Sequence, residues 1–371
     1  MEKSEYRIQA YDMIYLVKCA INGETPDKAK VDGMNMNALF EVCQQHILTA
    51  CSAYALESAG VQDHDFTQAK EKAIRKNILL DAERVKILKR LESEKIWYMP
   101  LKGALLKDLY PKLGMRQMSD NDILCDSNYR ARIKTIMLDM GFTCKHYGEG
   151  NDDAYFKPPV CNFEMHSELF IVTHVGKLYE YYEDVKQRLV RDEVNAYGYH
   201  FRTEDFYLYI TAHEYKHYAR GGTGVRSLVD IYVFLRNFQD MLDWSYINAE
   251  LAKLEIADYE KQNRELSMKL FQGQELSEEE RELLDYYIFS GTYGTFNNIF
   301  KNLIDEKGQG SKGRYIWKRV FPPMEHYKVW FPWAYRHKIL IPIAWLYRPI
   351  RGLMFRRKEL IAEFKYLKRN K

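Results

Sequence analysis

The stretch "PLKGALLKDLYPKLGMRQMSDNDILC", residues 100–125, decides the fold. It begins at the end of a short apolar run, "IWYMPL" (96–101), which predicts a buried strand. After a glycine turn, "GALLKDLYPKLG" (103–114) predicts a short helix. "NDILC" (121–125) then predicts a second strand. This order of strand, glycine turn, helix and strand indicates a small α/β core.

The rest of the chain predicts helices before this core and a helical region after it. Helical periodicity marks residues 35–59 and 67–94, and it returns from about residue 203, with loops near 258–276 and 306–313. Between these regions the pattern predicts a helix at 127–141 and strands at 142–147, 153–158 and 160–170. We therefore expect an α+β fold, with a small mixed β-sheet flanked by N-terminal helices and a C-terminal helical region.

Four domains follow from this pattern. They are an N-terminal helical region (1–94), an α/β core (95–200), a helical domain (201–305) and a basic, aromatic C-terminal helical segment (306–371).

The composition is that of a folded protein without a membrane span. The 371 residues are 46% hydrophobic and 29% charged. The six cysteines include no C-x-x-C pair, which favours buried free thiols in a reducing compartment. The N-terminus has no uninterrupted apolar run typical of a signal peptide, and the longest such run (339–347) is too short to cross a bilayer. We therefore expect a cytoplasmic protein.

The charge is unevenly distributed along the chain. Residues 310–371 carry 16 Lys and Arg and three acids, so this stretch is +13, and with a total of +3 the remainder is −10. Within it, residues 315–358 interleave aromatic and cationic side chains. This pattern fits short helices packed on the body with their cations outward, an anionic membrane surface, or contact with nucleic acid.

Carboxylates gather at two of the predicted strands. Asp120 and Asp122 are two residues apart at the start of "NDILC", so their side chains share a face. In "NFEMH" (162–166), Glu164 and His166 share a face in the same way. If the two strands are neighbours, the three carboxylates converge and repel one another unless a divalent cation lies between them. Hard oxygen ligands suit Mg²⁺ or Mn²⁺, so we expect a metal site at Asp120, Asp122 and Glu164.

Cationic side chains lie near the same place. Lys102 and Gly103 form a strand-to-helix turn, where backbone can approach a phosphate closely, and Arg116 adds positive charge. A phosphate-binding turn beside metal carboxylates is typical of phosphoryl or nucleotidyl transfer. The alternatives are a solvated Lys102, an Arg116 paired with Asp108 or Asp120, and a buried core histidine at 166 rather than one lining the site.

"HEYKH", residues 213–217, has the spacing of a zinc-protease helix. His213 and His217 would lie one turn apart, but the extended metzincin pattern fails because Arg220 and Thr223 occupy its glycine and final histidine positions. We expect these histidines to pack beside the core and face the nucleotide, with Asp230 orienting one of them. A zinc-dependent hydrolase that uses this segment remains the alternative.

These motifs together resemble a known family. "PLKGALLKDLYPKLGMRQMSDNDILC" followed by "NFEMHSEL" is similar to the uncharacterised nucleotidyltransferase family of the polymerase-β-like superfamily. The shared features are a Leu-Lys-Gly turn, a glycine–arginine pair, an Asp-x-Asp-hydrophobic strand and an acidic-x-His strand. "HEYKHYARGGTGVRSLVDIY" (213–232) resembles the downstream region of that family. One departure is the bulky Lys102, where the wider superfamily has a second small residue.

The resemblance implies roles for the site residues. Asp120 and Asp122 would bind the metals, Glu164 would be the third carboxylate, and Gly103 with Lys102 would hold the nucleotide phosphates. The implied reaction is in-line attack by an acceptor hydroxyl on the α-phosphorus of a nucleoside triphosphate, assisted by two Mg²⁺ or Mn²⁺ ions, with Glu164 taking the proton. A non-catalytic nucleotide-binding module is a further alternative.

Overall fold

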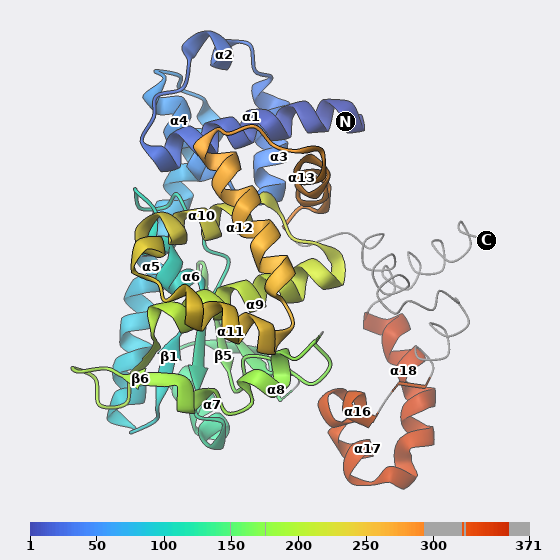
Figure 1. Cartoon of the computed structure of the whole chain (residues 1–371). Helices are drawn as coiled ribbons and strands as arrows, with labels where there is room; N and C mark the ends of the chain where they lie inside the picture. Colours follow the sequence, from blue (N-terminus) through green and yellow to red (C-terminus); the bar gives the residue numbers. More distant parts are fainter. Residues whose placement is uncertain (149, 175, 293–320, 323, 356–371) are drawn as a thin grey trace.

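The computed structural model describes residues 1–148, 150–174, 176–292, 321–322 and 324–355. Helices make up most of these residues, and a small mixed sheet lies among them, so the α+β expectation is confirmed (Figure 1). The predicted loop at 306–313 lies outside the described residues.

The central sheet has five strands in the order β1-β2-β5-β4-β3. β2 and β5 are parallel, while the other neighbours are antiparallel, so the sheet is mixed as predicted. Each strand falls within or beside a predicted run: β1 (Tyr98–Pro100), β2 (Asn121–Cys125), β3 (Thr143–His146), β4 (Asp152–Lys157) and β5 (Cys161–His166).

Alternation along the strands gives the sheet two different faces. Ile123, Phe163 and Met165 are buried on one face, against α5 (His64–Ser93) and α7 (Arg130–Asp139). Asp122 and Leu124 share the other face, and Leu124 belongs to the apolar cluster that contains residues of α9 (Thr203–Gly221). Helix α9 therefore covers the face of the sheet that carries the carboxylates.

A second sheet was not predicted. Its two antiparallel strands, β6 (Leu189–Arg191) and β7 (Tyr199–Phe201), pair next to the main sheet, to which a bridge between Tyr98 and Gly198 connects them. Strands of three residues are too short to show a period of two, which is why the sequence did not reveal them.

The N-terminal helices form a layer above the sheet in Figure 1. They are α1 (Lys3–Asn22), α2 (Lys28–Asp32), α3 (Met36–His46) and α4 (Thr49–Ser58), whereas the long α5 runs down beside the sheet and packs on its apolar face. The single helix predicted at 35–59 is wrong, because Ile47 takes a left-handed backbone conformation (φ 55°) and ends α3. An isoleucine carries no stop signal, so this break could not be read from the sequence.

The later helices pack on both the sheet and the N-terminal layer. They are α8 (Leu178–Tyr182), α9, α10 (Val225–Phe238), α11 (Trp244–Leu254), α12 (Ala257–Gln272) and α13 (Glu278–Ser290). The loop expected near 258–276 is wrong for most of its length, since α12 occupies it. Several of its charged side chains are exposed, but Glu260 is buried, and Leu266 and Phe271 are buried in a core shared with α1 and α10.

The last described helices form a small separate cluster. These are α16 (Met324–Trp330), α17 (Pro332–Arg336) and α18 (Ile341–Phe355), drawn in red in Figure 1. Their own core consists of Tyr327, Phe331, Ala334 and Ala344. Among the described helices, none combines the length and the apolar character needed to cross a membrane.

Candidate active site

The site is built on the parallel pair β2 and β5. Asp122 and Glu164 are register partners on these strands, so the expected neighbour relation holds and both carboxylates project from one face. Ligand atoms of Asp122, Glu164 and His166 all lie within 4.8 Å of one another, and this is the one such trio of potential metal ligands among the described residues. Oxygen donors in this arrangement fit a hard divalent cation.

Asp120 flanks this trio without joining it. It directly precedes β2 and is partly buried. Burial, together with the nearby charge of Asp122, raises its pKa, and the cations of Lys102 and Arg226 oppose that rise. Asp120 therefore belongs to the same electrostatic site, while its carboxylate lies farther out than that of Asp122.

The two facing carboxyls titrate in opposite directions. Burial and the charges of Asp122 and Asp120 raise the pKa of Glu164 to about 8. Burial acts on Asp122 in the same sense, but the Lys102 ammonium and the His166 ring hold the pKa of Asp122 well below its usual range. One carboxyl is thus a permanent anion, and the other is suited to accept a proton near neutral pH.

His166 positions Asp122. The side-chain amide of Asn151 is oriented by the carbonyl oxygens of Glu168 and Leu169, which accept from its Nδ2 at 2.9 and 3.4 Å. The same Nδ2 lies 3.3 Å from His166 Nδ1, so that ring nitrogen is the acceptor. His166 Nε2 therefore carries the hydrogen, which it donates to Asp122 Oδ1 at 2.8 Å. A protonated Nε2 orients the carboxylate and is not itself a metal ligand.

The turn after β1 brings a lysine to the carboxylates. Lys102 has φ 41° and ψ −112°, a conformation that glycine ordinarily fills, and its Nζ lies 3.3 Å from Asp122 Oδ2. Burial alone would lower the pKa of Lys102, but the charges of Asp122, Asp120 and Glu164 raise it. The ammonium is therefore a fixed cation at the carboxylate end of the site.

Position 103 requires a glycine because the side chains of Arg116 and Met118 pack directly against its Cα. A Cβ at this position would overlap Nη1 of Arg116 and would lie 2.9 Å from Cε of Met118. The amides that follow are already used, because Ala104 N donates to Leu101 O while Leu105 N and Leu106 N donate to Lys102 O. The turn can therefore contact a phosphate through the charged Lys102 side chain. The free backbone N–H groups that the sequence suggested are not provided, because α6 (Gly103–Leu106) is only four residues long.

Arg116 supports the turn from below. Its Nε and Nη2 each lie 2.8 Å from the carboxylate of Asp230 on α10, and Tyr110 donates to the same carboxylate at 2.6 Å. Arg116 was predicted to contact the nucleotide phosphates, and the alternative was a pair with Asp108 or Asp120. The structure pairs it with Asp230 instead, so Asp230 does not orient a histidine as expected. Arg116 and Asp230 are 114 positions apart, so only the folded chain brings them together.

A family model described as an uncharacterised nucleotidyltransferase matches residues 32–272, more than half of the chain. The chain belongs to this family. The match includes the Lys102 turn, the carboxylate strands and α9. A search of curated proteins found no match, and a search of solved structures found none either.

In this nucleotidyltransferase, α9 supplies the wall opposite the carboxylates. Tyr209, His213 and Lys216 lie on one face of the helix, and all three interact electrostatically with Lys102. Burial and the Lys102 charge lower the pKa of Lys216 to about 8, and within the described chain no carboxylate lies within ion-pair distance of it. The sequence analysis missed Lys216 and Asn151. Lys216 was visible as the cation inside "HEYKH", whereas Asn151 carries no motif.

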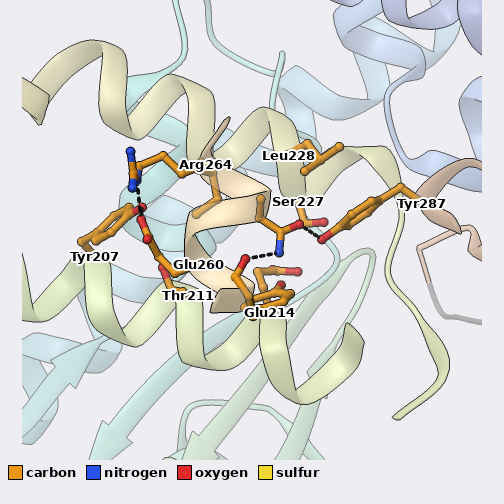
Figure 2. Close-up of a pocket in the computed structure, with 11 residues that line it drawn as sticks. Tyr207, Thr211, Glu214, Ser227, Leu228, Glu260, Arg264 and Tyr287 are labelled. Carbon is orange, nitrogen blue, oxygen red and sulfur yellow. Dashed lines mark hydrogen bonds and ion pairs between the residues drawn. The ribbon is translucent and has the colours of Figure 1, made fainter. Parts of the chain in front are cut away.

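The opposite face of α9 lines a polar pocket of the nucleotidyltransferase. Tyr207, Thr211 and Glu214 point into it, as Figure 2 shows, together with side chains of α10, α12 and α13. Tyr207 donates to Glu260 at 2.5 Å, and Thr223 donates to Glu214 at 3.2 Å. Helix α9 is therefore a partition between this pocket and the carboxylate site.

The paired histidines lie on the face of α9 that meets the Lys102 turn. Nε2 of His213 and Nε2 of His217 are 3.3 Å apart, and burial together with nearby lysines lowers the pKa of His213, while His217 is exposed at the surface. Glu214, the third residue of the zinc-protease pattern, lines the pocket on the other face. No described His, Cys, Asp or Glu joins the pair as a third ligand, so the zinc interpretation lacks a necessary component.

Proposed function

We propose that this protein transfers a nucleoside monophosphate from a nucleoside triphosphate to an acceptor hydroxyl, with Mg²⁺ or Mn²⁺, on a polymerase-β-like core. The observation that carries the proposal is the register pairing of Asp122 with Glu164, beside Lys102, in a chain that belongs to a nucleotidyltransferase family. We place the reaction in the cytoplasm, which the six free cysteines support.

The donor set fits divalent cations. Asp122 and Glu164 supply carboxylate oxygens, and Asp120 supplies another at the outer edge. When bound, the cations would activate the attacking hydroxyl and neutralise the departing pyrophosphate. His166 would keep Asp122 in a fixed orientation throughout, because its Nε2–H donates to Oδ1 of that carboxylate.

The phosphates would lie between the two walls of the site. Lys102 is held at the carboxylate end, and Lys216 approaches from α9 with His213 and His217 beside it. Cations on both sides of a triphosphate stabilise its charge in the ground state and in the transition state. Glu164 would accept the proton of the attacking hydroxyl once bound cations had neutralised the carboxylate charges that raise its pKa.

Label transfer from α-labelled nucleoside triphosphates tests the proposal. Purified protein, Mg²⁺ or Mn²⁺ and panels of sugars, small alcohols, proteins and RNA ends are incubated together, and γ-labelled triphosphates identify phosphoryl transfer instead. We expect Asp122→Asn to reduce α-label transfer by about 100-fold or more, because it removes a charge that acts on the reacting groups.

Asp139→Asn is the matched control, since Asp139 is an exposed carboxylate on α7. It should transfer label like the native chain. Transfer that survives Asp122→Asn would refute the assigned role, and stoichiometric zinc lost on His213→Ala would favour the hydrolase. Nucleotide binding without transfer to any acceptor would favour a binding module.

We also infer that the basic, aromatic C-terminal segment contacts an anionic partner, either a membrane surface or nucleic acid. The +13 charge of residues 310–371 supports this, against −10 for the rest of the chain.

A further inference from the structure

Among the described residues, α16, α17 and α18 pack into a small unit that exposes several large apolar side chains. Their inward side chains, among them Tyr327, Phe331 and Ala344, are fully or almost fully buried against one another. None of these residues joins the three larger apolar clusters of the body. The unit therefore has a small apolar core of its own, distinct from those of the body.

Aliphatic side chains form a stripe on the surface of this unit. Ile339 is 87% exposed, Ile343 54% and Leu346 74%. Their spacing of four and three residues places them on one side where the short turn before α18 continues into that helix. The same helices carry partly exposed aromatic side chains: Trp330, Trp333, Tyr335, Trp345 and Tyr347. Leucine and isoleucine held this far into water have no stabilising role in the isolated protein.

Positive charge accompanies the stripe. Arg336 and Lys338 are exposed and immediately precede Ile339. The surrounding sequence from 310 to 371 has a balance of +13. Exposed aliphatic side chains together with tryptophan, tyrosine and cations in the same segment make a composition that suits a helix lying in a lipid headgroup layer.

We propose that the face formed by Ile339, Ile343 and Leu346 inserts into the surface of an anionic lipid membrane. The aliphatic side chains would enter the acyl boundary, the aromatic rings would lie at headgroup level, and Arg336 and Lys338 would contact lipid phosphates. The acidic body would be repelled from the same surface, so the protein would dock through this unit alone.

Two other partners fit the face less well. Nucleic acid binds cations and stacks on aromatic rings, but it gives exposed isoleucine and leucine no apolar environment. A second copy of the chain would bring two strongly basic segments together, which is unfavourable. A lipid surface provides an apolar environment for the aliphatic side chains and phosphate groups for the cations.

Co-sedimentation of the full chain with vesicles tests the proposal. Vesicles of phosphatidylcholine alone are compared with vesicles that also contain phosphatidylglycerol, and tryptophan emission is recorded for each. We expect binding to the anionic vesicles with a blue shift in emission. The triple variant Ile339→Asn, Ile343→Asn, Leu346→Asn should bind at least about tenfold more weakly, because three apolar side chains no longer leave water.

The control and the charge variant separate the contributions. Val194→Asn changes a 92% exposed aliphatic side chain on the body and should bind like the native chain. The pair Arg336→Gln, Lys338→Gln should weaken binding to anionic vesicles and leave binding to phosphatidylcholine vesicles unchanged. Circular dichroism and the thermal midpoint confirm that each variant is folded.

Three results would overturn the proposal. One is native chain that does not bind anionic vesicles. Another is a folded triple variant that binds them equally well. The last is self-association or oligonucleotide binding that the triple variant abolishes while vesicle binding is absent throughout. None of these outcomes depends on nucleotidyl transfer, so the two proposals are tested separately.

Discussion

At the scale of single residues, Lys102 combines backbone strain with a charge that the site needs. Its φ of 41° and ψ of −112° cost a lysine about 1–3 kcal/mol relative to an unstrained conformation. The same backbone places the ammonium 3.3 Å from Asp122, among carboxylates that repel one another. A glycine would relieve the strain but would remove the cation. This accounts for a lysine at a turn position whose backbone conformation favours glycine.

Glu164 gives a prediction about pH. Its carboxyl has a usual pKa of 4.5 and a pKa of about 8 in the folded protein. Between these values the unfolded chain has lost the proton while the folded chain retains it, so the free energy of unfolding falls as pH rises through this window. Glu164→Gln should remove this contribution, which is at most about 1.4 kcal/mol per pH unit. Urea unfolding in EDTA at several pH values measures it.

Two comparisons make that experiment specific. Other groups titrate in both proteins, so the informative quantity is the difference between the native and variant profiles. Glu180→Gln, an exposed glutamate on α8, should leave the profile unchanged. Parallel profiles for the native chain and Glu164→Gln would show that Glu164 has an ordinary pKa.

At the scale of elements, α9 presents different chemistry on its two sides. Lys216 and His213 face the carboxylates, while Tyr207 faces the polar pocket and donates to Glu260. Side chains spaced three and four residues apart share one face of a helix, so one face of α9 lies toward the carboxylates and the opposite face lines the pocket. Tyr207 and Tyr209 are both fully or almost fully buried in one apolar cluster, which holds the helix in place.

Substitutions on the two sides of α9 should affect different quantities. Lys216→Ala should raise KM for the nucleoside triphosphate by about 10-fold or more, because a charged contact with phosphate is lost. Tyr207→Phe should leave KM unchanged and lower the free energy of unfolding by about 1.5–3 kcal/mol, since a buried hydrogen bond to a carboxylate is removed. Steady-state kinetics and urea unfolding of both variants test this. Equal effects of both substitutions on KM would argue against separate roles.

The elements that could be predicted are those set by local pattern. β2 coincides with "NDILC", and the alternation of Phe163, Glu164 and Met165 correctly separated a buried face from a polar one. The contacts of Arg116 with Asp230 and of Asn151 with His166 could not be predicted, because each joins separate segments through packing. The sequence offered several partners of equal charge for Arg116, and only the arrangement of α10 decides among them.

At the scale of the whole molecule, the Arg116–Asp230 pair joins the sheet unit to the helical body. Asp230 lies on α10, whose apolar side chains share a core with α1, α4 and α12. Arg116 lies directly beneath Gly103. The position of the Lys102 turn therefore depends on helices that are distant in the sequence.

Loss of the Arg116–Asp230 ion pair should lower the stability of the fold substantially. Arg116→Ala should lower the free energy of unfolding by about 3–5 kcal/mol, because Asp230 is left as a buried and unpaired charge. Arg132→Ala is the control, since Arg132 makes a similar two-pronged contact with Glu94 at the surface, and its loss should cost about 0–1 kcal/mol. Denaturant unfolding of both variants gives the comparison. Equal costs would mean that burial of the pair has no bearing on its strength.

The position of α9 between the pocket and the carboxylate site has a consequence for how substrate preference could change. Replacements behind the helix, at positions that never meet a nucleotide, would tilt or shift it and so move Lys216 and His213 on its far side. Substitutions among the pocket residues could thus change substrate preference, in evolution or in a laboratory selection, while the acidic residues of the site stay the same.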